Sequence, residues 1–116
     1  MKFMLMIIDD EPAQAKFSET EMRALFDQVG AIEAELKASN KLVDSRALRP
    51  SAEAATVRMR AGRPVVTDGP FSESKEVLGG YFLVDCESRQ EALEWARRFP
   101  YAGLAAIEVR PLWEMS

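Results

Sequence analysis

Two serine residues, each followed three positions later by a glutamate, most constrain how this chain can fold. The pairs Ser18–Glu21 and Ser88–Glu91 have the spacing of a helical capping box. Each pair precedes apolar residues that recur at helical spacing. We therefore expect one long helix over about residues 19–38 and a shorter helix after Ser88.

Outside these helices the apolar residues recur with a period of two, which is typical of β-strands. Residues 56–60 and 65–67 are separated by turn residues, which predicts a hairpin. Further strands are expected at residues 3–8, 42–43, 81–85 and 107–109. This order predicts a single α+β domain over residues 1–116, with a ferredoxin-like antiparallel sheet, two helices on one face and an inserted β-hairpin.

Two helices can cover only one face of the predicted sheet. The opening strand is nevertheless apolar on both sides, with one set formed by Phe3, Leu5 and Ile7 and the other by Met4, Met6 and Ile8. A broad apolar sheet surface left in water favours association. We therefore expect the chain to form a homodimer.

Charge and composition argue against several kinds of partner. The chain has 15 lysines and arginines against 19 acidic residues, and the basic residues are scattered, so we expect no direct nucleic-acid binding. The apolar opening run is too short to span a membrane. One cysteine, Cys86, and no histidine allow no internal disulfide and no zinc site. We expect a cytoplasmic protein without metal or cofactor.

Three acidic residues, Asp9, Asp10 and Glu11, follow the first predicted strand. Acids at this position bind magnesium in response-regulator receivers. A receiver is built from alternating strands and helices, however, whereas residues 54–67 predict a hairpin where a helix would be needed. We therefore reject the receiver interpretation.

The segment Asp68-Gly69-Pro70-Phe71 and the residues after it concentrate ionisable side chains beside a rigid turn, a common setting for function. The Asp68 carboxylate either accepts backbone N–H groups and holds the turn, or acts as a general acid or base. The sequence leaves both roles open. Asp68 is the predicted catalytic residue.

Other side chains near this segment also have two interpretations. Lys75 and Glu76 are either exposed or reach a cleft, and the Tyr81 hydroxyl either is satisfied in the core or donates to a ligand. Arg110 pairs with Glu108 or binds an anion. The predicted ligand-binding residues are Asp68, Phe71, Lys75, Glu76, Tyr81 and Arg110.

Several separated motifs resemble the DGPF branch of the YCII-related family. They are Asp68–Phe71, Glu73, Lys75–Glu76, Gly79–Gly80, Ala92–Ala96 and Glu108–Leu112. The resemblance covers nearly the whole chain and implies a dimeric α/β barrel of ferredoxin-like subunits. Some relatives in the wider group are enzymes for small cyclic or aromatic molecules, for which a His-Asp pair has been proposed. This chain has no histidine, so that pair cannot operate here.

The resemblance also implies a link to regulation, because members of this branch are often encoded near or fused to alternative sigma factors. Three functions stay open at this point. The first is a small-molecule-binding or sensing module, and the second is a lyase or isomerase that uses Asp68 as acid or base. The third is a dimerisation module without a ligand site. The first two require a cleft that is connected to solvent.

Overall fold

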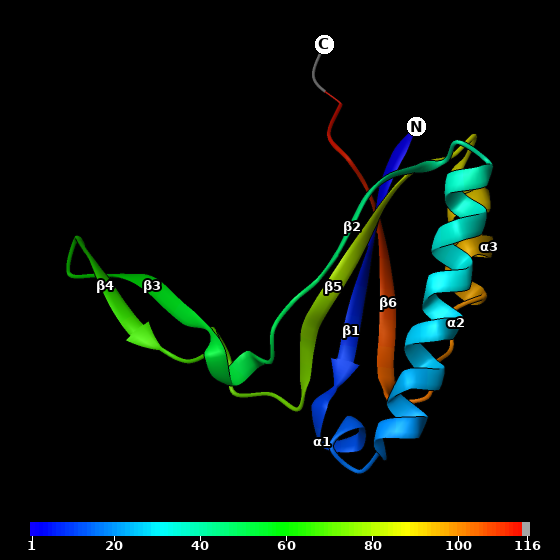
Figure 1. Cartoon of the computed structure of the whole chain (residues 1–116). Coiled ribbons are helices and arrows are strands. Elements are labelled where there is room, and N and C mark those ends of the chain that lie inside the picture. The colour runs from blue at the N-terminus through cyan, green and yellow to red at the C-terminus, as the bar shows by residue number, and fades with distance from the viewer. Residues whose placement is uncertain (115–116) are drawn as a thin grey trace.

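The computed structural model describes residues 1–114, whose helices and strands are shown in Figure 1. The elements are β1 (Lys2–Asp10), α1 (Glu11–Gln14), α2 (Glu19–Ala38), β2 (Leu42–Ala47), the 3₁₀ turn η1 (Ser51–Glu53), β3 (Ala55–Arg60), β4 (Arg63–Asp68), β5 (Glu76–Asp85), α3 (Arg89–Arg97) and β6 (Leu104–Pro111). The two predicted helices and the predicted hairpin are confirmed. The strands are longer than their sequence patterns indicated, and α1 and η1 were not predicted.

Four strands form the main sheet in the order β2-β5-β1-β6, and every neighbouring pair is antiparallel. The helices α2 and α3 both lie on one face of this sheet (Figure 1). This arrangement is the predicted ferredoxin-like α+β fold, with β3 and β4 inserted between β2 and β5. Within residues 1–114, the opposite face of the sheet carries no helix.

Both helices begin at the serines that the sequence indicated. Ser18 and Glu21 form a complete capping box, in which the Glu21 N–H donates to Ser18 Oγ at 3.1 Å and the Ser18 N–H donates to Glu21 Oε1 at 3.0 Å. Ser88 also accepts from the Glu91 N–H, at 3.2 Å. The Glu91 carboxylate, however, accepts from the Glu87 N–H rather than completing a box with Ser88.

The core lies between the two helices and the central strands. Its buried members include Phe3, Leu5, Ile32, Leu36, Phe82, Val84, Ala92 and Phe99. The Phe82 and Phe99 rings meet edge to face at 5.1 Å between centroids. Only Ile32 and Leu36 are buried among the α2 residues, and both belong to its C-terminal half. The N-terminal half of α2 therefore does not pack closely on the sheet.

The strands β3 and β4 form a separate two-stranded hairpin, which we call the hairpin arm (residues 55–68). The arm extends from the body on the side opposite to α2 and α3 (Figure 1). Its turn has positive φ at Ala61 and Gly62, as a two-residue hairpin turn of the favoured hand requires. Every residue of β4 is exposed.

Candidate functional site

A cavity of about 600 Å³ lies between the N-terminal half of α2 and the sheet. This volume is within the usual range for small-molecule sites. Its lining is largely apolar and includes Ile7, Met22, Leu25, Phe26, Val29, Leu48, Leu78, Phe82, Phe99 and Leu104. Phe26 and Leu48 are 65% and 50% exposed, so parts of the cavity wall are in contact with solvent.

The carboxylate of Asp9 stands in this apolar cavity. Side chains alternate along β1, so Asp9 shares the helix-covered face with Leu5 and Ile7. Partial burial raises the pKa of Asp9 above its ordinary value of 3.8, and the nearby Glu11 charge raises it further. A hydrogen bond from the Gln14 side chain acts in the opposite direction but is weaker than the effect of burial. Asp9 is therefore a carboxyl group whose charged form is disfavoured by its surroundings.

Gly79 makes the space that the Asp9 carboxylate occupies. The strand β5 has an extra residue at this point, because Ile7 pairs with Gly80 while Ile8 pairs with Leu78. A Cβ at position 79 would overlap Asp9 Oδ2, so any larger residue would force the Asp9 carboxylate to move from its place. Glycine therefore lets the carboxylate lie against the strand.

The short helix α1 closes the cavity beside Asp9. The Asp10 carboxylate caps it by accepting from the Ala13 N–H at 3.1 Å, and the Asp10 N–H donates to the Gly103 carbonyl at 3.0 Å. Gln14 Nε2 donates to the same carbonyl at 3.0 Å. Gly103 has φ of +78°, where L side chains are strained. These bonds hold the Gln14 amide next to Asp9.

The other carboxylates of the cavity wall are already engaged. Glu11 accepts from the N–H and the hydroxyl of Ser51 at 2.9 and 2.5 Å, and these bonds lower its pKa. Glu33 accepts from the Ser45 hydroxyl at 2.7 Å. Asp9 is therefore the carboxylate best placed to meet a molecule in the cavity.

Tyr81 is the one predicted site residue that lines this cavity within the described part of the chain. Its hydroxyl donates to Asp44 Oδ2 at 2.8 Å, and Arg46 Nη1 lies 2.9 Å from Asp44 Oδ1. The hydrogen bond raises the pKa of Tyr81 and lowers that of Asp44. The Tyr81 hydroxyl thus already has a partner within the sheet.

The segment around Asp68 forms the base of the hairpin arm. The Arg58 guanidinium lies 4.7 Å from the Phe71 ring centroid and also donates to the Phe71 carbonyl, while Thr56 Oγ1 donates to the Gly69 carbonyl at 2.8 Å. The Asp68 side chain is exposed at the end of β4. These bonds account for the rigid turn that the sequence indicated, and the roles predicted for Asp68 and Phe71 stay predictions.

The remaining predicted residues lie away from the cavity. Lys75 is exposed, and its carbonyl accepts from the Glu11 N–H at 3.1 Å. Glu76 is exposed at the start of β5. Arg110 is exposed on β6 and pairs with Glu108 at 2.6 Å, as the alternative interpretation of the sequence expected. Ligand contacts by these three residues stay predictions.

Asp9 and Gly79 were the residues that sequence reasoning missed. The usable signal was the alternation Phe3, Leu5, Ile7, which continues to Asp9 and so places an acid on a face that is otherwise apolar. The glycine pair at 79–80 indicates close backbone approach, which is found at Gly80, but it does not indicate the space for Asp9 at Gly79. Gly80 allows β5 to approach β2 closely, since a Cβ there would lie 2.7 Å from the Arg46 carbonyl oxygen of that strand.

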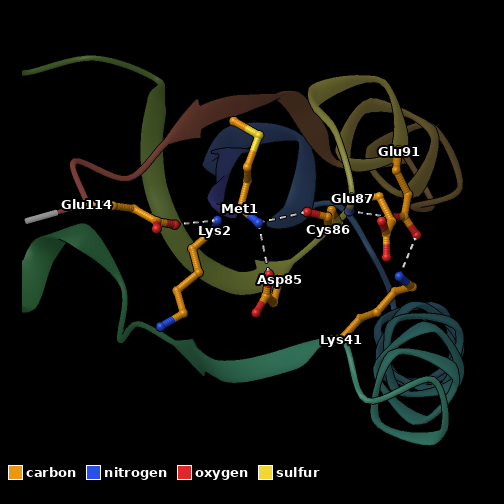
Figure 2. A network of polar contacts seen from close by, with 8 residues as sticks. All are labelled: Met1, Lys2, Lys41, Asp85, Cys86, Glu87, Glu91 and Glu114. Atoms are coloured by element: carbon orange, nitrogen blue, oxygen red, sulfur yellow. Dashed lines mark hydrogen bonds and ion pairs between the residues drawn. The ribbon is translucent and has the colours of Figure 1, made fainter. Parts of the chain in front are cut away.

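A second, polar hollow lies at the opposite end of the sheet, where Figure 2 shows a set of polar contacts. The Met1 ammonium lies 3.2 Å from Asp85 Oδ1 and donates to the Cys86 carbonyl at 3.0 Å. Lys41 Nζ lies 2.9 Å from Glu91 Oε2. The Cys86 thiol is buried, which raises its pKa. These groups satisfy one another, so this hollow is a structural feature.

Residues 1–114 contain no cluster of three or more cysteine, aspartate or glutamate side chains that could hold a metal ion. Over the same residues, no helix has the length and apolar character needed to cross a membrane.

Comparisons with known proteins place the whole chain in one group. The family described as the YCII-related domain matches residues 1–116. An uncharacterized protein of Rhizobium meliloti (strain 1021) is 36% identical over 114 residues, which cover 97% of this chain and 92% of that protein. A solved structure of 5-chloro-2-hydroxyhydroquinone dehydrochlorinase (TftG) from Burkholderia phenoliruptrix AC1100, in complex with 2,5-dihydroxybenzoquinone, is 18% identical with a TM-score of 0.49. That match covers 100% of this chain and 96% of the other.

Proposed function

The chain belongs to the YCII-related family, and we propose that its cavity binds a small, largely apolar molecule whose hydroxyl or similar group donates to the Asp9 carboxylate. The observation that carries this proposal is a half-buried carboxylate with a raised pKa in an apolar cavity of about 600 Å³. Apolar walls with few polar groups are typical of sites that bind small organic molecules.

The charges around the cavity favour a neutral ligand over an anion. The arginines at its wall are already paired, Arg46 with Asp44 and Arg49 with Glu53, the latter through two hydrogen bonds at 3.2 and 2.9 Å. An anionic ligand would meet Asp9 without a free cation from the described residues to offset the repulsion. A neutral molecule with a hydrogen-bond donor is the chemistry that this cavity accommodates best.

A second candidate function is catalysis of proton transfer, with Asp9 as the base or acid. The half-buried position of Asp9 in the cavity favours this function, because burial raises its pKa, and perturbed carboxyls that face a cavity are common among catalytic acids and bases. A lyase or isomerase acting on a cyclic or aromatic molecule fits this role. The catalytic role predicted for Asp68 is a competing form of the same hypothesis.

We further propose that two copies of the chain associate through the helix-free face of the main sheet. Met4, Met6 and Leu83 lie at the centre of this face, each only partly buried, between the ion pairs Glu108–Arg110 on β6 and Asp44–Arg46 on β2. Burying such a row of apolar side chains against a second copy removes it from water. A regulatory link to a sigma factor, which the family resemblance implies, stays a prediction because it rests on no residue of the site.

The binding proposal is tested with 1-naphthol, a neutral apolar molecule with one acidic hydroxyl, and with naphthalene, which lacks the hydroxyl. Ligands of the native state raise the melting temperature. We expect 1-naphthol to stabilise the wild-type protein more than naphthalene does, and Asp9→Asn to narrow that difference because a charge-assisted hydrogen bond is lost.

Asp68→Asn is the matched control, because it removes the same charge from an exposed carboxylate outside the cavity. It should leave the preference for 1-naphthol unchanged. If Asp68→Asn removes the preference and Asp9→Asn does not, the site belongs to the base of the hairpin arm, and the proposal for Asp9 is wrong.

The raised pKa of Asp9 also predicts a pH dependence. The folded protein holds this proton more tightly than the unfolded chain, so the stability that Asp9 contributes is present below pH 3.8 and is lost as the pH rises through its folded pKa. Asp9→Asn should therefore be more stable than the wild-type protein at pH 7, and the difference should vanish below pH 3.8. Urea unfolding at several pH values measures this, and a difference that grows on acidification contradicts it.

A further inference from the structure

The hairpin arm has one face that is apolar beyond Asp68 at its base and that nothing in the described chain covers. Cross-strand pairing places Val57 opposite Val66 and Met59 opposite Pro64, so these four side chains share one face. Val57, Met59 and Val66 are 63%, 67% and 68% exposed. An isolated two-stranded hairpin is marginally stable in water, so an arm of this kind needs a surface to pack against.

The other face of the arm is basic. Arg58 shares it with Val65 and Thr67, and Arg60 and Arg63 form the last pair before the turn. The arm thus carries three arginines and one aspartate, whereas the whole chain has a net charge of −4. The rest of the chain is therefore acidic, so a basic arm is attracted to a second copy of the same body at long range, while its arginines face away from the apolar contact.

The direction of the arm also favours a second copy. The arm extends on the helix-free side of the main sheet, which is the face proposed to pair two chains (Figure 1). A chain docked on that face lies on the same side as the arm. An arm that leaves one copy in this direction can reach the body of the other, and two-fold symmetry repeats the contact.

The areas are consistent with this arrangement. Four strands at about 4.8 Å spacing and about 26 Å length give a sheet face of roughly 500 Å², so the two sheets alone bury roughly 1,000 Å². That is below the usual size of a stable interface, which is about 1,600 Å². One face of each arm contributes about 200 Å² and covers an equal area of the partner, so the two arms add roughly 800 Å². The total is then roughly 1,800 Å².

We infer that the apolar face of the hairpin arm docks on a second copy of this chain and stabilises the dimer. The inference rests on the proposed pairing through the sheet but not on the ligand proposed for the cavity. It assigns a purpose to the exposed apolar residues of the insertion and makes the arm, rather than the sheet alone, the determinant of dimer affinity.

The test measures the dimer dissociation constant by sedimentation equilibrium for the full chain and for Val66→Glu, with Thr67→Glu as the matched control. Val66 and Thr67 are adjacent and exposed but lie on opposite faces of the arm. Val66→Glu should weaken the dimer at least about tenfold, since it places a charge in a packed contact. Thr67→Glu should leave the dimer dissociation constant within about twofold of the wild-type value.

Val57→Glu, on the same face as Val66, should repeat the loss, and circular dichroism confirms that each variant remains folded. Met6→Glu tests the sheet face independently. If Met6→Glu separates the copies while Val66→Glu and Val57→Glu do not, pairing through the sheets is supported and the docking of the arm is overturned. If the wild-type protein is monomeric at every concentration, both are overturned. Thermal shifts with 1-naphthol test the cavity separately.

Discussion

The two halves of helix α2 meet the same sheet in different ways. The C-terminal half places Ile32 and Leu36 in the core, where Leu36 is fully buried. The N-terminal half leaves Met22 and Leu25 half-buried around the cavity. One end of the fold is therefore packed for stability, and the other end keeps free space. A small domain can hold a cavity of this size because the opposite end of the same helix anchors the layer.

Polar groups follow the same division. At the packed end the Met1 ammonium, Lys41 and Glu91 satisfy one another or backbone carbonyls (Figure 2). At the open end Asp9 remains in partly apolar surroundings with a raised pKa. Strained or unfavourably placed groups persist where the surrounding structure compensates for them, and this is common at functional sites.

The sharpest test of the comparison removes one leucine from each half of α2. Leu36→Ala should lower the free energy of unfolding by about 3 kcal/mol, because it leaves a cavity in the packed core. Leu25→Ala removes the same atoms from a wall that already borders free space, so it should cost about 1 kcal/mol or less. Urea unfolding of both variants measures the difference, and equal losses would show that the two halves are packed alike.

Gly79→Ala should have the next largest effect. The added Cβ collides with Asp9 Oδ2, so we expect a loss of about 1–3 kcal/mol and a weaker preference for 1-naphthol over naphthalene. Gly30→Ala is the matched control: Gly30 lies within α2 with no atom near the added Cβ, and helix propensity predicts a gain of about 0.5–1 kcal/mol. If Gly79→Ala proves neutral, Gly79 does not make the space for Asp9.

The smallest expected effect is at the Lys41–Glu91 ion pair of the packed end. Lys41→Met should lower the free energy of unfolding by less than Leu36→Ala or Gly79→Ala does. Both side chains of the ion pair remain about one quarter exposed, so solvent screens their attraction. The Lys41 hydrogen bond lowers the pKa of Glu91 below its ordinary 4.5, so the contribution is present above pH 4.5 and is lost as the pH falls through the folded pKa.

Unfolding of Lys41→Met and Glu91→Gln, singly and together, at pH 7 and at acidic pH measures this contribution. Arg97→Met is the control, since its pair with Glu94 is longer, at 3.6 Å, and more exposed. A loss for Arg97→Met as large as that for Lys41→Met would mean that partial burial adds nothing to the Lys41–Glu91 pair.

Much of the fold could be predicted because its signals are local. Ser18 and Glu21 determine where α2 begins within one helical turn, and the two-residue period identifies the arm. The charge pair of Glu108 and Arg110 also follows from spacing along one strand. Such features depend on residues a few positions apart, which can be compared directly in a sequence.

The candidate site could not be predicted in the same way. Asp68 and its neighbours stood out because they are chemically rich, yet the structure places them at the base of the arm. In the sequence, Asp9 stands out only as an acid of the receiver-like motif. Its environment depends on Gly79 and on Gln14, which is held by Gly103, and these positions are far apart in sequence.

The sequence by itself thus determined the family, the order of helices and strands, and the ferredoxin-like class, because caps, periodicity and turn residues act over short distances. Only the tertiary structure decided where free space remains and which carboxylate faces it. That outcome depends on the bulge at Gly79 and on the loose packing of the N-terminal half of α2, and both arise from contacts between distant segments.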